Sequence, residues 1–483
     1  MDRAATFSIL FSYFFILNTQ AQTAQFPAQS CSALWTHAKP GDSRYDSSRD
    51  SDYRSFIARM KSENLLRQEC LKTWTILISM SVSNDLKKYA IKNLKQLEKQ
   101  TKGAHLRTDI IVQLEDQSSQ TVRRYHLFQP QSAQPFHEVV QDLENLSLDE
   151  IQSPIISESK TVDFKQKNRF SSFIRWGAKS YPSENLMLIF WGHGRGWQTL
   201  SELGVANTLA KVRKWRGRPL EILAWDACYM QSLENVVEVA PWTRFVCGSE
   251  DVESYEGYDY ASLIQSVIQP ESEGDYPPHS GIPPESVLDI ASSIPETYQA
   301  AFNSSTDSKK QIDPSITENL TGSTVQSHFV IKRLVPSLNQ LAIALKDFTH
   351  IPAHWDAVRS LIKSRSTYRG GTRDLGIFLE DLLETVQRID SGPHATDNSK
   401  LLDLILSTCG ALNEAVIRRA LGHGYRSPHP DQICKPAGLS IFLPQTKSEF
   451  HEQLNLVNRA SLYQGDHFFS IQSSWADWVK SMY

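Results

Sequence analysis

The sequence predicts an α/β protein with a mainly parallel central sheet covered by helices on both faces. Continuous apolar runs of strand length occur several times, and the run 186–191 is the most hydrophobic. Strands that are apolar on both faces are typical of buried parallel sheets. Stripes of apolar residues at helical spacing, such as those in 86–97 and 170–178, separate the runs. Alternation of the two patterns indicates a sheet between two layers of helices.

The individual elements follow from the same patterns in chain order. Asn84-Asp85 supplies a helix N-cap after the first apolar run. We expect 122–128 to form a hairpin with the strand before it. The expected strands are 74–80, 107–114, 122–128, 186–191, 221–225, 245–249 and 438–443, and the expected helices are 86–97, 170–178, 233–240, 287–302, 329–348, 354–361 and 374–386.

The N-terminus is typical of a secretory signal peptide over 1–21. Arg3 precedes an apolar run over 4–17, which is short for a membrane span, and Thr19-Gln20-Ala21 suits signal peptidase. An uncleaved N-terminal anchor is the alternative. We therefore expect a secreted or periplasmic protein that has no membrane contact after removal of the signal.

The remaining chain of 483 residues divides by composition. A polar N-terminal extension over 22–73 precedes an α/β core over 74–270. A polar linker with one helix follows over 271–325. The region 326–483 is largely helical and returns a strand, 438–443, to the core. The formal charge of −4 gives no indication of a nucleic-acid partner.

The six cysteines permit disulfides in an exported protein. Cys31–Cys70 and Cys409–Cys434 are plausible pairs, because each lies within one region of the chain. This pairing leaves Cys228 and Cys247 unpaired. Cys247 lies inside an expected strand, which favours a buried structural thiol. The sequence contains no CxxC or HExxH pattern, so no metal site is expected.

Two candidate reactive side chains follow expected strands directly. His193, flanked by glycines, comes after 186–191, and Cys228 comes after 221–225. The carboxyl ends of parallel strands share one edge of a sheet, where catalysis occurs in such folds. We therefore expect both side chains at the same edge.

A cysteine and a histidine at one sheet edge suit nucleophilic catalysis. The thiolate is the nucleophile, and an imidazole accepts the thiol proton. A helix expected to start near Met230 would lower the thiol pKa. The Gly194 and Cys228 amides could form an oxyanion hole. Taken singly, each motif also fits a structural role, such as an inert buried cysteine.

The segments Trp191-Gly192-His193-Gly194 and Asp226-Ala227-Cys228-Tyr229-Met230 resemble the His and Cys motifs of the clostripain-like cysteine peptidases, in the caspase, gingipain and legumain superfamily. The similarity runs in order from 74 to 483. It implies a caspase-like three-layer sandwich whose C-terminal extension is largely helical. It also implies that His193 is the general base and acid, that Cys228 is the nucleophile, and that the enzyme forms a thioester intermediate.

The resemblance further implies protein or peptide substrates with Arg or Lys before the cleaved bond. An acidic pocket would explain that preference, because a buried cation needs a paired carboxylate. Asp226 matches the family's pocket acid, and Glu256 lies near the expected second acid. Asp251 and Glu253 are rivals of Glu256. The structural alternatives are a helix-capping role for Asp226 and a solvated loop position for Glu256.

The sequence departs from the family pattern between His193 and Cys228. Only 35 positions separate them, and the basic cluster in 211–218 has the spacing of a helix plus turn. Self-cleavage is therefore not expected there, and Lys309-Lys310 or the N-terminal extension are alternative processing sites. The resemblance leaves calcium as an alternative, because some relatives use it, but no Asp-rich calcium loop is evident here and no cofactor is expected. We expect a monomer.

Two other functions fit the same fold. One is a catalytically silent secreted binding protein, although it would have no need to retain His193, Cys228 and Asp226 together. The other is a related peptidase that cleaves after Asp or Asn. Such an enzyme would need a cationic or neutral pocket in place of Asp226.

Overall fold

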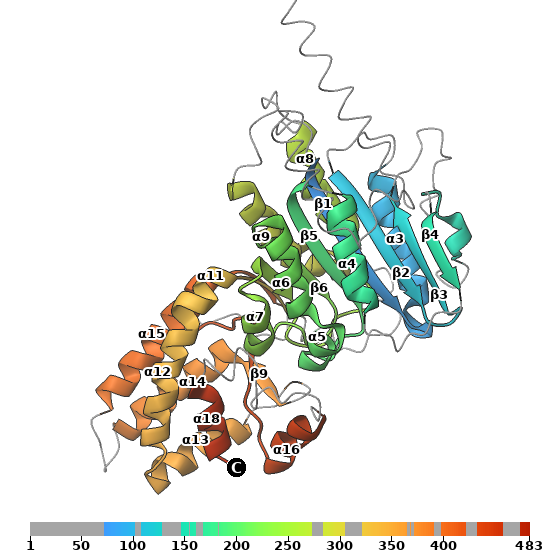
Figure 1. The fold of residues 1–483 in the computed structure, drawn as a ribbon. Coiled ribbons are helices and arrows are strands. Elements are labelled where there is room, and N and C mark those ends of the chain that lie inside the picture. The colour runs from blue at the N-terminus through green and yellow to red at the C-terminus, as the bar shows by residue number, and fades with distance from the viewer. Residues whose placement is uncertain are drawn as a thin grey trace, which may run out of the picture.

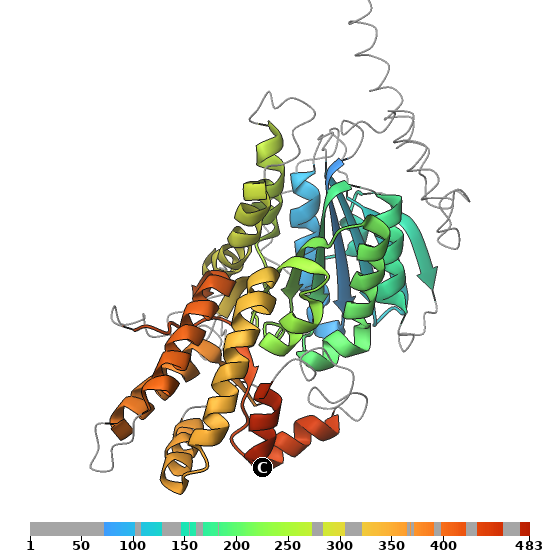
Figure 2. The same ribbon diagram turned by 60° about the vertical axis from the view of Figure 1, so that its left-hand side comes forward.

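A large twisted sheet between layers of helices forms one end of the molecule, and a group of C-terminal helices forms the other (Figure 1, Figure 2). The structure is a computed structural model. It describes residues 72–101, 108–127, 146–153, 155–160, 168–181, 183–272, 284–304, 321–364, 368, 371–390, 398–421, 432–456 and 474–483. The expected signal peptide, the Cys31–Cys70 pair and Lys309-Lys310 lie outside these residues.

The central sheet has nine strands in the order β10-β8-β7-β6-β5-β1-β2-β3-β4. The middle of the sheet, from β7 to β2, is parallel, and antiparallel strands extend it on both sides. The strands are β1 Lys72–Val82, β2 Thr108–Asp116, β3 Thr121–His126, β4 Ile155–Lys160, β5 Ser183–Gly192, β6 Leu220–Asp226, β7 Thr243–Gly248, β8 Thr321–Gln326 and β10 Val416–Leu421.

Helices cover both faces of this sheet, which confirms the three-layer prediction. Residues of α3, α8 and α9 join one apolar core, and residues of α4, α6, α7 and the C-terminal helices join the other. None of the helices in the described ranges is long and apolar enough to cross a membrane. The helices are η3 Asn84–Leu86, α3 Lys87–Gln100, η5 Leu148–Glu150, α4 Arg169–Ser180, α5 Trp197–Leu203, α6 Val205–Arg216, α7 Leu233–Val239, α8 Tyr260–Ser272, α9 Pro284–Ser304, α11 Ser327–Phe329, the π-helix η7 Val330–Leu334, α12 Val335–Phe348, α13 Pro352–Ser364, α14 Leu375–Asp390, α15 Ser399–Ala415, α16 Lys447–Leu456 and α18 Ser474–Ser481.

Strand β1 shows why the apolar runs predicted the sheet correctly. Successive side chains of a strand point to opposite faces. Ile76, Ile78 and Met80 enter the core under α3, whereas Leu77 enters the core on the opposite face. A strand that is apolar at every position can therefore exist only between two helical layers.

The late strand is present but pairs differently from the prediction. β11 (Ser440–Phe442) pairs with β9 (Thr372–Asp374) in a separate two-stranded sheet and does not join the central sheet. β8 and β10 instead extend the central sheet beyond β7. β8 lies in the last part of the segment predicted as a polar linker. β8, β10 and β11 are short or polar, so the apolar pattern that would predict their pairing is weak.

The disulfide Cys409–Cys434 is formed, which confirms one of the two predicted pairs. It joins α15 to the segment that precedes β11. Cys228 and Cys247 are free thiols, as the pairing scheme implied.

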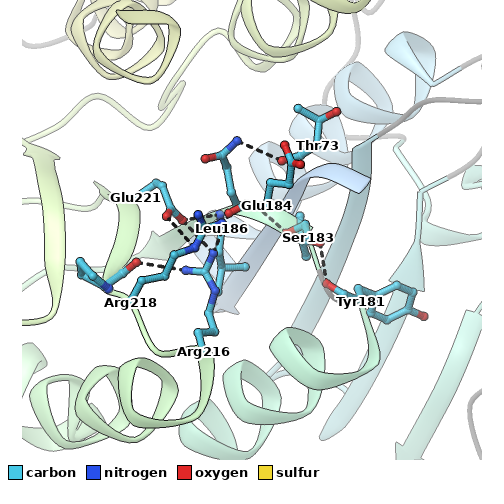
Figure 3. A network of polar contacts seen from close by, with 11 residues as sticks. Thr73, Tyr181, Ser183, Glu184, Leu186, Arg216, Arg218 and Glu221 are labelled. Carbon is cyan, nitrogen blue, oxygen red and sulfur yellow. Dashed lines mark hydrogen bonds and ion pairs between the residues drawn. The ribbon is translucent and has the colours of Figure 1, made fainter. Parts of the chain in front are cut away.

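The segment between His193 and Cys228 folds into α5 and α6, as its spacing predicted. A buried ion pair fixes the end of α6 to the amino ends of β5 and β6 (Figure 3). Glu221 accepts hydrogen bonds from the Leu186 amide at 2.7 Å and from the Arg216 guanidinium at 3.0 Å. Arg216 also donates to the Glu184 carbonyl at 3.1 Å. Arg216 is thus part of the packed fold, whereas the other basic residues of the cluster are exposed.

Replacing Glu221 with Ala should lower the free energy of unfolding by about 3–5 kcal/mol, because Arg216 would remain buried without its carboxylate. Chemical denaturation measures this change. The matched control is Glu414→Ala, since Glu414 pairs with Arg333 at the surface. This variant should lower the free energy of unfolding by less than about 1 kcal/mol. Equal decreases for both variants would contradict the assigned role of the network.

Candidate active site

The structure brings His193 and Cys228 to the same edge of the central sheet. His193 follows β5 and Cys228 follows β6, and these strands are adjacent and parallel. Trp191 is in register with Asp226 at the carboxyl end of the pair. The loops that carry the two side chains therefore leave the sheet side by side.

The two loops touch through their backbones at Gly194. A Cβ atom added at Gly194 would lie 2.0 Å from the Cys228 carbonyl oxygen and 2.7 Å from the Cys228 nitrogen. Only glycine fits at this distance, so the sequence pattern around His193 has a direct steric reason. Tyr229 adopts a positive φ of 61°, a conformation that is uncommon for residues other than glycine. Its amide donates to the Asp251 carbonyl at 3.0 Å, which helps to hold this turn.

Cys228 is mostly buried, and its environment favours the neutral thiol. Burial, followed by the charge of Glu253, raises the pKa of Cys228 to about 11. The Glu253 amide donates to the sulfur at 3.3 Å. The expected lowering of the pKa by a helix N-terminus is not found, because α7 begins only at Leu233 and burial dominates.

His193 contacts a carboxylate that the sequence analysis treated only as a helix cap. Its Nε2 lies 3.1 Å from Asp85 Oδ2, and both side chains are about half exposed. The Ser83 hydroxyl donates to Asp85 Oδ1 at 2.6 Å. This hydrogen bond, together with His193, lowers the pKa of Asp85. The sequence signal that could have identified Asp85 is its position, because Asp85 follows β1, and β1 is the neighbour of β5.

Asp226 is buried two residues before Cys228 in the chain. Its carboxyl group faces a second carboxyl group, that of Glu253. The Tyr260 hydroxyl donates to Asp226 Oδ2 at 2.9 Å, and the Tyr258 amide donates at 3.3 Å. Burial raises the pKa of Asp226 to about 7. Burial and the charge of Asp226 raise the pKa of Glu253 well above its usual value.

Glu253 is the less satisfied member of this carboxyl pair. The Asp226 carboxyl and the Ala227 amide lie within reach of hydrogen bonds to it. Within the described part of the chain, however, no hydrogen bond of standard length and angle reaches either of its carboxyl oxygens. The site therefore holds two buried carboxyl groups next to each other.

The two other acids considered from the sequence have different surroundings. Glu256 forms an ion pair with Lys92 of α3, and its carbonyl accepts from Asn93 at 3.4 Å. Asp251 contributes its carbonyl oxygen to the Tyr229 turn. Burial also raises the pKa of Asp251. Of the three acids, Glu253 is the one that interacts with Asp226.

Cys247 is buried in β7, and the Thr324 hydroxyl donates to its sulfur at 3.2 Å. This environment is that of a structural thiol, and burial raises its pKa to about 12. Among the described residues, no group of three or more His, Cys, Asp or Glu side chains is arranged to hold a metal ion.

The family model "Clostripain family" matches residues 78–481, which include both loops of the site. The chain belongs to the clostripain family. It is therefore a cysteine peptidase by family, as the paired motifs predicted. A comparison with curated proteins gives no significant match.

Two solved structures of clostripain-family proteins share this fold. An inactive zymogen C11 protease from Parabacteroides distasonis is 16% identical with a TM-score of 0.51, and the match covers 81% of this chain and 97% of the other. A secreted C11 cysteine protease from Bacteroides thetaiotaomicron, in complex with an irreversible peptide inhibitor, is 16% identical with a TM-score of 0.50. That match covers 84% and 99%. At this identity the likeness concerns the fold.

Replacing Gly194 with Ala should lower kcat/KM for peptide cleavage by about 100-fold, because the added methyl group would push the His193 loop away from Cys228 and a shift near 1 Å has this effect. Steady-state kinetics measure the loss. The matched control is Gly410→Ala in α15, where an added Cβ meets no neighbouring atom. An unchanged rate in Gly194→Ala would refute the importance of this contact.

Proposed function

We propose that this peptidase hydrolyses peptide bonds after Arg or Lys, using His193 and Cys228 as a catalytic dyad. The observation that supports the specificity is the buried Asp226–Glu253 pair beside Cys228. The observation that supports the dyad is the shared sheet edge and the Gly194–Cys228 backbone contact.

The chemistry follows from the raised pKa of the thiol. Because Cys228 is neutral near pH 7, His193 takes the thiol proton as the sulfur attacks the substrate carbonyl carbon. The Gly194 and Cys228 amides donate to the developing oxyanion. The peptide C–N bond then breaks as His193 returns the proton to the leaving amine. This step leaves a thioester on Cys228.

Hydrolysis of the thioester completes the cycle. His193 removes a proton from a water molecule, which attacks the thioester carbon, and the C–S bond breaks as the sulfur recovers a proton. Asp85 acts as a positioning residue: its contact with Nε2 directs the other ring nitrogen of His193 toward the reacting groups. A fixed imidazole orientation is the usual role of such a carboxylate.

The pocket acids account for the preference for Arg or Lys. A cation between Asp226 and Glu253 would donate hydrogen bonds to both carboxyls and would allow both to ionise. Lys92 already compensates the charge of Glu256. We therefore assign the second pocket position to Glu253 and place Glu256 outside the pocket, in the wall next to α3.

We also propose that the enzyme acts outside the cytoplasm, as a monomer without a cofactor, on protein or peptide substrates. The N-terminal sequence and the Cys409–Cys434 disulfide support an oxidising compartment. Self-cleavage between His193 and Cys228 is not part of the proposal. The basic residues there lie in α6 and its buried ion pair.

Replacing Cys228 with Ala should abolish cleavage of a fluorogenic peptide that ends in Arg, because no other group supplies the nucleophile. The matched control is Cys247→Ala, which removes the other free thiol and should retain activity. Full activity in Cys228→Ala would rule out the dyad. Loss of activity in both variants, with folded protein, would show that the assay does not report on Cys228 alone.

Replacing Asp226 with Asn should lower kcat/KM for an Arg substrate by about 100- to 1000-fold, the loss expected when a buried cation loses its carboxylate. In the native enzyme kcat/KM should rise as pH increases through about 7, because Asp226 gains its negative charge there. The variant should lack this rise.

A substrate with neutral citrulline in place of Arg is the control for this variant. The native enzyme should prefer Arg, whereas Asp226→Asn should treat the two alike. The comparison variant Glu256→Gln should keep the preference for Arg, since Glu256 pairs with Lys92. A retained preference in Asp226→Asn would contradict the pocket assignment.

A further inference from the structure

A cavity of about 510 Å³ lies beside Asp85, the residue that contacts His193. Its walls come from the β1–α3 turn, the first turns of α3, Leu146 and the loop that carries Tyr255. Asp85 is one of the wall residues, and its carboxylate contacts His193 at 3.1 Å. The cavity is therefore separated from the imidazole by a single side chain.

The charged groups of this cavity already have partners. Lys87 pairs with Asp116 at 2.9 Å, and the Lys88 ammonium lies over the Tyr89 ring at 5.5 Å. Asp85 contacts His193 and Ser83. An ionic ligand would have to compete with these contacts. The rings of Tyr89 and Tyr255 and the side chain of Leu146 are the apolar groups that remain for a new contact, beside the polar side chain of Asn84.

Tyr255 makes the strongest case for a ligand. Its ring stacks on Tyr89 at 5.4 Å with an interplanar angle of 14°, yet the residue is 52% exposed. Leu146 adds apolar surface to the same cavity. A large exposed aromatic residue in a cavity wall is typical of a binding surface, because it offers contact area at a low entropic cost.

The position of the cavity indicates which part of a peptide would enter it. His193 returns its proton to the leaving amine, so the residues that follow the cleaved bond lie on the side of the imidazole. A cavity that begins at Asp85 is thus next to the leaving part of the substrate.

We propose that this cavity is a second specificity site that binds an aromatic or large aliphatic side chain at one of the first two positions after the cleaved bond. The inference rests on the proposed function, since it uses the roles of His193 and the acidic pocket. Tyr255 is the specificity-determining residue, and its ring stacks on or packs against the substrate side chain. The preferred substrate is therefore a basic residue followed by an aromatic or large aliphatic one.

The test uses internally quenched peptides with Arg before the cleaved bond and Phe, Leu, Gly or Glu at each of the next two positions. The native enzyme should cleave Phe and Leu peptides about three- to tenfold faster in kcat/KM than Gly peptides, which is the range for one aromatic contact. Tyr255→Ala should remove this difference, so that the Phe, Leu and Gly peptides are cleaved with similar kcat/KM. Tyr255→Phe should restore it.

The control variant is Ile343→Ala in α12, an exposed apolar residue that does not line the cavity. It should behave as the native enzyme does. The inference fails if the native enzyme cleaves all Arg peptides equally, or if Tyr255→Ala keeps the preference. A preference for Glu would also overturn it. Failure of the native enzyme to cleave any Arg peptide, including the Gly peptide, would instead reject the proposed function.

Discussion

The parallel pairing of β5 with β6 is the constraint on which the whole site depends. It places Trp191 opposite Asp226, so the loops that carry His193 and Cys228 leave the sheet from the same edge. The close approach of Gly194 to the Cys228 backbone then sets their separation. Side chains on longer or independent loops would lack this fixed distance. The rest of the active site is built on the relation between these two strands.

The C-terminal region contacts the segment that follows Cys228. The Ser440 amide of β11 donates to the Gln231 carbonyl at 3.0 Å, and the Phe442 amide donates to Glu234 at 2.8 Å. The indole of Trp475 donates to the Phe442 carbonyl at 3.1 Å. The small sheet therefore connects the segment after Cys228 to the helical extension. This connection gives the extension a part in holding the active site.

Burial governs the electrostatics of the site. It raises the pKa of the Cys228 thiol and also the pKa values of the Asp226 and Glu253 carboxyls. A cationic side chain changes that balance, because it stabilises the ionised carboxylates. Substrate binding and proton release are thus coupled in the proposed mechanism.

The sequence by itself determined the three-layer fold, the two loops with His193 and Cys228, and the Cys409–Cys434 pair, because apolar periodicity and short spacing express local constraints. It could not give the partner of β11, the polar edge strand β4, or the contacts of Asp85 and Glu253. Only the tertiary structure decided these, since they depend on which distant segments meet. A loop carboxylate has no periodic pattern, and its role is set by the neighbour that it reaches.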